Sequence, residues 1–380
     1  MIDRSELEKF LIKFRQEMHR FPELSNQEFN TTEKIRNVLE KNGIDCLDTG
    51  LKTGLCANIK GDHPGKTIAL RADIDALPIL EQSGVSYASE YPGVMHACGH
   101  DLHTSVLLGA AILLQEQKSN LHGEVKILFQ AAEETGVGAK AVLESGSLNE
   151  VEAIFGFHND PSLPVGTLGT KSGALTAAVD RFEIQIKARG AHAAKPHEGR
   201  DPMLVIAQII QAFQPLVSRE ITPDSHAVVS ITQVHSGSTW NVIPEQAMLE
   251  GTVRTFSREN RTYIEARIRT ILDSLARLHE VEIELLWYGN CPSVFNDERL
   301  TTLSLTCAKE VMTETKIVKE TAIGEDFAYY QEQIPGSFVM IGSGGPYELH
   351  DPRFRVDDAM ISQAVDYFVL LAKTYLAPTS

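Results

Sequence analysis

Near the start of the chain, apolar residues recur every three or four positions, which predicts an amphipathic helix that Pro22 ends. Ser5 and Glu8 have the spacing of a capping box at the start of this helix. A second helix is predicted over Thr31–Asn42, with Gly43 as its C-terminal stop. The apolar face of the first helix consists of Leu7, Phe10, Leu11, Phe14 and Met18.

Beyond the second helix, short apolar runs alternate with helical patterns. This alternation predicts an α/β layered domain around a central, mostly parallel sheet. The predicted strands are Leu55–Lys60, Thr67–Ala72, Val125–Gln130, Ala153–Phe157 and, much later, Phe338–Ile341. The predicted helices are Leu102–Gln115, Ala139–Ser145 and a closing helix from about Asp358 to Tyr375.

The pattern changes near Ala178, where a strand–helix–strand–strand–helix–strand order begins. This order is typical of a ferredoxin-like α+β unit. The sequence therefore predicts a main domain formed by residues 1–178 and 291–380, with residues 179–290 inserted as a second domain. The elements of the insertion are Phe182–Ala188, Asp201–Val217, Ala227–Val234, Ala247–Phe256, Arg261–Leu278 and Val281–Tyr288.

Composition narrows the class of protein. The 380 residues carry a formal charge of −16 and show no cluster of Lys and Arg, which argues against a nucleic-acid partner. No apolar run approaches the roughly 18 residues of a membrane span, and the polar N-terminus does not resemble a signal peptide. The five cysteines are scattered and odd in number, which favours reduced thiols. We therefore expect a cytoplasmic protein with no membrane partner.

The densest chemical signal lies in Met95–His103, where three histidines and a cysteine precede an apolar helix. A thiolate and a neutral imidazole are good ligands for zinc and similar ions. A single histidine here would be read as a surface residue, but the clustering of Cys98 with His100 predicts a metal site.

Further candidate ligands follow predicted strands. Glu133 and Glu134 come just after one strand and His158 ends another, while His350 lies in a loop rich in Gly and Pro. Ligands bind beyond the carboxyl ends of strands in α/β sheets, so we expect these residues to converge with Cys98 and His100. Taken singly, each would be read as structural. Asp73 and Asp75 also follow a strand, and we expect them to accept the second N–H of ligating imidazoles.

The chain resembles the aminoacylase, hippurate hydrolase and auxin-conjugate hydrolase branch of the dinuclear metallopeptidases. The resemblance extends over nearly the whole sequence, and the cysteine-containing segment and the Glu-Glu pair are its most specific motifs. The matching segments are His19–Leu24, Arg71–Pro78, His96–Asp101, Gln130–Glu134, Trp240–Pro244, Gly324–Phe327 and Leu349–Pro352. Two departures are Asp73-Ile-Asp75, where many wider relatives have His-x-Asp, and Gln130-Ala-Ala-Glu in place of Gln-Pro-Ala-Glu.

The resemblance implies two divalent ions per chain, manganese or zinc, with cobalt or nickel also compatible with the mixed ligands. It implies an inserted domain that acts as a lid and mediates assembly into a homodimer or higher homo-oligomer. It assigns His192, in this inserted domain, to the scissile carbonyl, and it links Asn241 and Arg254 to substrate binding. The implied metal ligands are Cys98, His100, Glu134, His158 and His350, with Glu133 as the general base.

We therefore predict an amidohydrolase that cleaves N-acyl-L-amino acids of the N-acetyl or hippurate type with metal-activated water. Cys98 is the predicted bridge between the ions, since a thiolate has spare lone pairs.

The closest alternative function is that of a deacetylase of N-acetyl-diaminopimelate, followed by that of a dipeptidase or aminopeptidase. Two other classes remain possible on sequence alone: a cysteine hydrolase with Cys98 as nucleophile, and a non-catalytic metal-binding protein.

Overall fold

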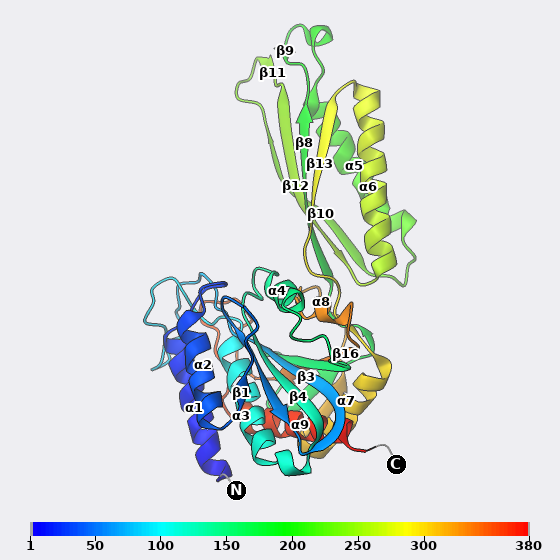
Figure 1. Cartoon of the computed structure of the whole chain (residues 1–380). Coiled ribbons are helices and arrows are strands. Elements are labelled where there is room, and N and C mark those ends of the chain that lie inside the picture. The colour runs from blue at the N-terminus through cyan, green and yellow to red at the C-terminus, as the bar shows by residue number, and fades with distance from the viewer. Residues whose placement is uncertain (1–2, 379–380) are drawn as a thin grey trace. The chain divides into compact units, whose positions relative to one another are not determined.

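The structure is a computed structural model that describes residues 3–378. The chain divides into two compact units (Figure 1). The larger unit comprises the chain up to Leu175, Phe295–Lys319 and the chain from Asp326 onward. The inserted unit comprises Thr176–Val294 and Glu320–Glu325. Within the described residues, no helix is long and apolar enough to cross a membrane.

An eight-stranded mixed sheet forms the centre of the larger unit, in the order β1-β2-β4-β3-β5-β16-β6-β15. Its central strands β4, β3, β5 and β16 are mutually parallel, so their carboxyl ends lie along one edge. These four strands are buried over most of their length, as expected for a parallel sheet covered on both faces. The strands are β1 Asp45–Cys46, β2 Leu55–Lys60, β3 His63–Asp73, β4 His122–Gln130, β5 Ala153–Asp160, β6 Thr167–Thr170, β15 Glu314–Ile317 and β16 Gly336–Gly342.

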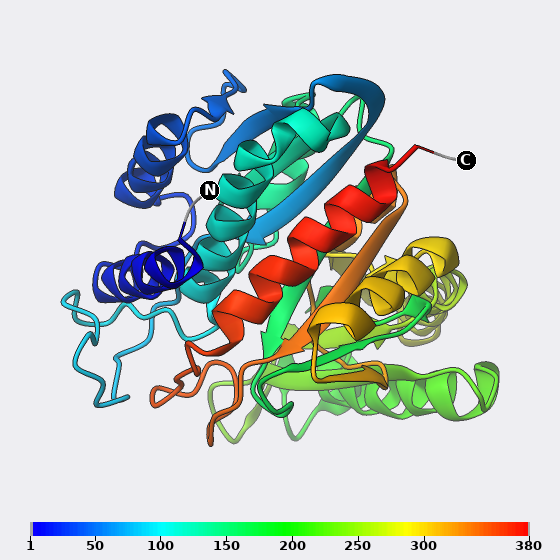
Figure 2. The same cartoon turned by 90° about the horizontal axis from the view of Figure 1, so that it is seen from below.

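Helices α3 and α9 lie side by side over one face of this sheet, with α1 and α7 on their outer flanks (Figure 2). Helix α3 is apolar around most of its circumference and is almost wholly buried. Gly109 of α3 allows this packing, because a Cβ there would lie 2.6 Å from Leu11 and 2.8 Å from Val365. The helices are α1 Arg4–Arg20, α2 Phe29–Lys41, α3 His100–Glu116, α4 Gly138–Glu144, α7 Glu298–Val311, α8 Ala328–Gln331 and α9 Met360–Leu376, with short 3-10 turns at Lys118–Asn120 and Pro196–Glu198.

The inserted unit has a four-stranded antiparallel sheet in the order β10-β12-β8-β13. With α5 and α6 packed on one face, this is the strand order of a ferredoxin-like fold, as predicted (Figure 1). A small ribbon, β9 with β11, pairs His192 with Val242. The elements are β8 Ala178–Lys187, β9 Ala191–His192, α5 Pro202–Glu220, β10 Ala227–Ser236, β11 Val242–Ile243, β12 Gln246–Thr255, α6 Arg258–His279 and β13 Glu282–Gly289, and a second ribbon in the larger unit joins β7 Gly173–Ala174 to β14 Phe295–Asn296.

Two local expectations differ from the structure. The predicted capping box is wrong: Asp3 is the N-cap of α1, and its carboxylate accepts from the backbone N–H groups of Ser5 and Glu6 at 2.8 and 3.2 Å. Strands β6 and β15 were not predicted, because segments of four residues carry little periodicity. Helix α7 was also not predicted, although its buried residues Leu300, Ser304 and Cys307 recur at helical spacing.

Candidate metal centre

The predicted ligands come from the carboxyl-terminal edge of the central strands. His158 lies near the end of β5, and Glu133 and Glu134 lie in the turn that follows β4. Cys98 and His100 lie at the start of α3, where Gly99 between them has φ of +91°. A Cβ on Gly99 would lie 1.9 Å from Asn159 Oδ1, so both the backbone conformation and the close approach require glycine.

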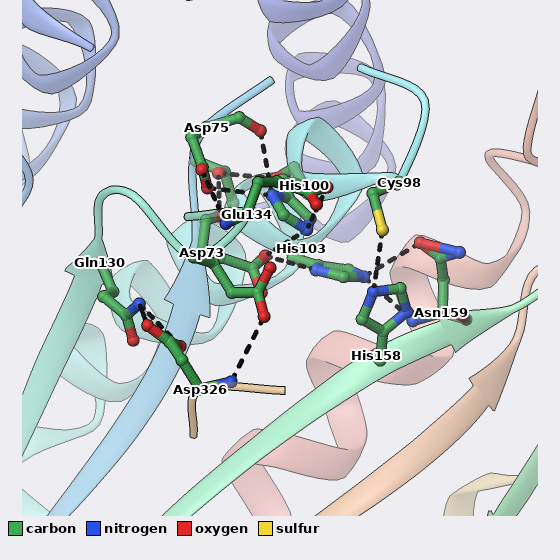
Figure 3. Close-up of polar contacts among 12 residues, drawn as sticks. Asp73, Asp75, Cys98, His100, His103, Gln130, Glu134, His158, Asn159 and Asp326 are labelled. Atoms are coloured by element: carbon green, nitrogen blue, oxygen red, sulfur yellow. Dashed lines mark hydrogen bonds and ion pairs between the residues drawn. The ribbon is translucent and has the colours of Figure 1, made fainter. Parts of the chain in front are cut away.

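All five predicted ligands converge in the larger unit, and Figure 3 shows four of them. Cys98 Sγ lies 3.3 Å from His158 Nε2. Glu134 Oε1 lies 3.9 Å from His100 Nε2 and 3.7 Å from His350 Nε2. Their donor atoms fall into overlapping groups within 4.8 Å, and Glu133 joins the group of His100 and Glu134.

Hydrogen bonds to the imidazole rings orient the nitrogens that could bind metal. His100 Nδ1 lies 2.9 Å from the carbonyl oxygen of Asp75 and 3.2 Å from its carboxylate. His158 Nδ1 lies 2.7 Å from the carbonyl oxygen of Asn159. A carbonyl oxygen only accepts, so Nδ1 donates in both rings, which leaves Nε2 as the nitrogen that faces the other candidate donors.

Asp75 therefore contacts the Nδ1 of a predicted ligand, His100, as expected. Asp73 instead contacts a different histidine. Its Oδ1 lies 2.6 Å from Nδ1 of His103, a histidine that the sequence analysis assigned no role. Nε2 of His103 in turn accepts from the backbone N–H of Asn159 at 3.0 Å. Asp73 and His103 thus connect β3 to β5 among the predicted ligands, as Figure 3 shows.

A second buried network lies behind Asp73. Arg71 donates to Asp73 at 2.7 Å, to Asp326 at 2.8 Å and to Gln130 Oε1 at 2.9 Å. Asp326 also accepts from the Gln130 amide at 2.8 Å, while its own backbone N–H lies 3.3 Å from Glu133 Oε1. Arg71 and Asp326 lie in recognised motifs, but only the fold reveals that they support Asp73 and Glu133.

The electrostatics of the site favour a bound cation. Burial, reinforced by Glu134 and Glu133, raises the pKa of Cys98 well above its usual value. Burial, with a contribution from Asp75, also raises the pKa of Glu134 to about 7. Burial opposes the charged form of His100, yet the carboxylates of Asp73 and Asp75 raise its pKa to about 10. Too many acidic groups are gathered here to ionise together without compensating positive charge.

The donor set also fits a metal geometrically. His100 Nε2 and Glu134 Oε1 are buried and make no hydrogen bond among the described residues. Buried polar atoms are rarely left without a partner. A divalent ion among the sulfur, imidazole and carboxylate donors would satisfy both atoms. The donors beside Cys98 also favour a metal ligand over a nucleophilic cysteine, because a cysteine hydrolase would leave Glu134 and His350 without a role.

The remaining predicted residues belong to the inserted unit. His192 is exposed in β9 and pairs with Val242, next to Asn241, whose carbonyl accepts from the N–H of Ala193 at 3.0 Å. Arg254 lies near the far end of β12. The structure thus brings His192 and Asn241 together and separates both from Arg254.

The α/β fold and this donor set define a metal-dependent hydrolase, and comparison with known proteins gives the family. The model of Peptidase family M20/M25/M40 matches residues 69–374. The chain belongs to this family.

Three relatives cover almost the whole chain. An N-acetylcysteine deacetylase of Bacillus subtilis is 48% identical over 95% of this chain and 96% of its own length. An N-acetyl-L-cysteine deacetylase of the same organism is 44% identical over 99% of this chain and 90% of its own length. A B. subtilis crystal structure, described as a dinuclear metal binding peptidase of the M20 family, shares 45% identity with a TM-score of 0.89, covering 98% of this chain and 99% of its own. The predicted fold and the predicted class, a metal-dependent amidohydrolase of N-acyl amino acids, are confirmed.

Proposed function

We propose that Cys98, His100, Glu134, His158 and His350 hold two divalent ions and that Glu133 is the general base of amide hydrolysis. The observation that carries the proposal is the convergence of these donors around two buried atoms, His100 Nε2 and Glu134 Oε1, that have no hydrogen-bond partner within residues 3–378. Manganese and zinc suit the mixed sulfur, nitrogen and oxygen donors best, with cobalt and nickel also compatible.

Cys98 is the residue that would be shared by the two ions if both were bound. Its sulfur belongs to two donor groups, one with His100 and His158 and one with Glu134 and His350. A thiolate has lone pairs for two ions, whereas a neutral imidazole nitrogen has one. A high-resolution structure of the loaded protein with Cys98 on one ion and only carboxylate or solvent between the ions would contradict this assignment.

Bound divalent ions supply the acidity that makes water a nucleophile near neutral pH and polarise the substrate carbonyl. Glu133 accepts the proton of the attacking water and passes it to the leaving amine. The backbone N–H of Asp326, 3.3 Å from Glu133 Oε1, helps to orient the carboxylate. His192 donates to the developing oxyanion, a contribution of roughly 3–4 kcal/mol for one donor.

We propose N-acetyl-L-cysteine as the substrate to test first. The two deacetylases of this compound are 44% and 48% identical to the chain and align over nearly all of it. Asn241 and Arg254 are the proposed substrate-binding residues, with the arginine suited to the carboxylate of the amino acid.

We further propose that the active enzyme is a homodimer or a higher homo-oligomer. Asn241 lies at the β9–β11 end of the inserted unit, and Arg254 lies eight residues into β12 from its first residue, Gln246. Eight residues of strand span about 26 Å, much longer than one amino acid. A single inserted unit therefore cannot bring both ends to one substrate, but two subunits can.

The edge strand β10 is the proposed contact surface. It is the outer strand of its sheet over ten residues, and Val228 and Val234 are each 44% exposed on it. A long exposed strand edge with apolar side chains is a template for pairing with another chain. Pairing with the same strand of a second copy would give the closed twofold contact common in homodimers.

The proposed function is tested by a hydrolysis screen on metal-stripped protein to which manganese, zinc, cobalt or nickel is returned. The substrates are N-acetyl-L-cysteine, other N-acetyl amino acids, N-benzoylglycine, N-acetyl-diaminopimelate and a dipeptide. We expect metal-dependent release of the amino acid, fastest from N-acetyl-L-cysteine. Faster cleavage of N-acetyl-diaminopimelate or of the dipeptide would overturn the substrate assignment, and activity that survives chelation would overturn the metal mechanism.

A further inference from the structure

One residue next to the proposed base has an unusual backbone conformation. Ala132 has φ of +55°, in the left-handed region that side-chain-bearing residues seldom occupy. It lies between the end of β4 and Glu133 and is 1% exposed. The tight turn that presents Glu133 and Glu134 begins directly after it, and is closed by a hydrogen bond from the N–H of Gly136 to the carbonyl of Glu133 at 2.7 Å.

The N–H of Ala132 is held by a carboxylate from a distant part of the chain. Oε1 of Glu28 accepts it at 2.9 Å. Glu28 is 0% exposed, and burial raises the pKa of its carboxyl group. A buried carboxylate is costly to keep in a fold, so the hydrogen bond that it accepts from a main-chain N–H beside the base calls for a reason.

Glu28 is not needed as the N-terminal cap of helix α2. It occupies the N-cap position of α2, yet its side chain makes no capping hydrogen bond. Instead, Glu23 accepts from the backbone N–H groups of Asn30 and Thr31 at 3.2 and 2.8 Å. Because Glu23 satisfies the first turn of α2, the carboxylate of Glu28 is available to Ala132.

The same short segment supports the adjacent glutamate as well. Ser25 donates to Asp75 Oδ2 at 2.7 Å, and that same oxygen accepts from the backbone N–H of Glu134 at 3.0 Å. The residues from Ser25 to Glu28 therefore act on the turn at two points, directly at Ala132 and through Asp75 at Glu134.

From this geometry we infer that Glu28 is a positioning residue for catalysis: its carboxylate holds Ala132 in the left-handed conformation and so aims Glu133 at the reacting water. The left-handed conformation of Ala132 bends the chain at the end of β4, and the turn that follows carries Glu133 and Glu134. Without the acceptor, Ala132 relaxes toward an ordinary conformation and the base moves. The inference rests on the proposed role of Glu133.

Two conservative variants separate the effect of the length of the Glu28 side chain from the effect of its charge. Glu28→Asp keeps the carboxylate but withdraws it from Ala132, and we expect kcat to fall about 10- to 100-fold with little change in KM. Glu28→Gln removes the charge but keeps an oxygen at the same reach, and we expect near wild-type kcat. Bound metal is measured in each variant, because a displaced Glu134 would lower it.

Rescue by glycine is the decisive step. Glycine adopts the left-handed conformation without strain. In the Glu28→Asp background, Ala132→Gly should therefore restore most of the kcat that was lost, and most of the bound metal if that was lost too. If Glu28 only fills space, Ala132→Gly should leave the defect unchanged or worsen it, and the inference fails. It also fails if Glu28→Asp equals wild type, or if Glu28→Gln is the more damaged variant. A wild type with no hydrolytic activity, or an active Glu133→Gln variant, would instead refute the proposed function.

Discussion

Nδ1 of His100 lies 2.9 Å from the carbonyl oxygen and 3.2 Å from the carboxylate of Asp75. The carbonyl fixes the proton on Nδ1, and the carboxylate makes the ring a stronger base. The orientation of His100, a proposed metal ligand, thus depends on Asp75, which is not itself among the proposed ligands.

Removing that support should weaken metal binding. We expect Asp75→Ala to lower metal affinity about 10- to 100-fold, measured by competition with a chelator of known affinity. Asp62→Asn, an exposed position without a hydrogen bond to any ligand, serves as the control and should leave the affinity unchanged. Equal affinities in Asp75→Ala and wild type would show that the His100–Asp75 contact does not support the site.

Metal affinity should also depend on pH. The pKa of Glu134 is raised to about 7 and that of Cys98 is raised further, so protons occupy these two proposed ligands in the metal-free protein below neutral pH. Metal must displace those protons, and the affinity should therefore fall as the pH drops from 8 to 6. Calorimetry in two buffers of different ionisation enthalpy would detect proton release on binding. An affinity that is constant over this range would contradict the expectation.

Arg71 compensates two buried carboxylates and should matter strongly for stability. Arg71→Met leaves Asp73 and Asp326 buried without their shared cation, and we expect a loss of about 3–5 kcal/mol in the free energy of unfolding by urea. Arg4→Met is the matched control, because Arg4 pairs with Asp366 on the surface and should contribute about 0–1 kcal/mol. Similar losses in the two variants would refute the structural role of Arg71.

Gly99 is constrained both by its positive φ and by its close approach to Asn159. Comparison with a second glycine separates these two effects. Gly93 also has positive φ, +85°, but a Cβ there would meet no atom within 4 Å. Gly93→Ala should therefore cost about 1–2 kcal/mol of backbone strain alone. Gly99 lies between the proposed ligands Cys98 and His100, and Gly99→Ala adds a clash with Asn159. We therefore expect a larger loss of stability and reduced metal content. Equal unfolding energies and equal metal content would contradict this reasoning.

A mixture of two inactive variants would test whether neighbouring subunits share a site. Glu133→Gln removes the base and His192→Ala removes the proposed oxyanion donor. If His192 acts on the partner's site, subunit exchange between these proteins should restore activity up to about one quarter of the wild-type rate. No recovery, despite mixed oligomers confirmed by native mass spectrometry, would place His192 in its own subunit's site or outside catalysis.

The sequence predicted the parts of this molecule that carry local signals. The buried strands beneath the site and the apolar helix α3 follow from their hydrophobic patterns. The candidates Glu133, Glu134 and His158 follow from their placement at the ends of predicted strands. The resemblance to family motifs then selected His350. This residue has φ of +67° and lies in an irregular loop without helical or strand periodicity.

Contacts between distant segments could not be predicted in this way. The hydrogen bond from His103 to Asp73 spans 30 residues and that from Arg71 to Asp326 spans 255. Each depends on which strands become neighbours, which the pattern of a single strand does not specify. Glu28 illustrates the point most clearly, since its position before α2 suggests a helix cap and its carboxylate instead holds Ala132.

The most direct test of the central claim compares wild type and Glu133→Gln for bound metal and for hydrolysis of N-acetyl-L-cysteine. We predict two divalent ions per chain in both proteins, turnover in wild type that stops on chelation and returns with added metal, and no turnover in the variant. Hydrolysis by Glu133→Gln, or by wild type after its metal has been removed, would contradict the account.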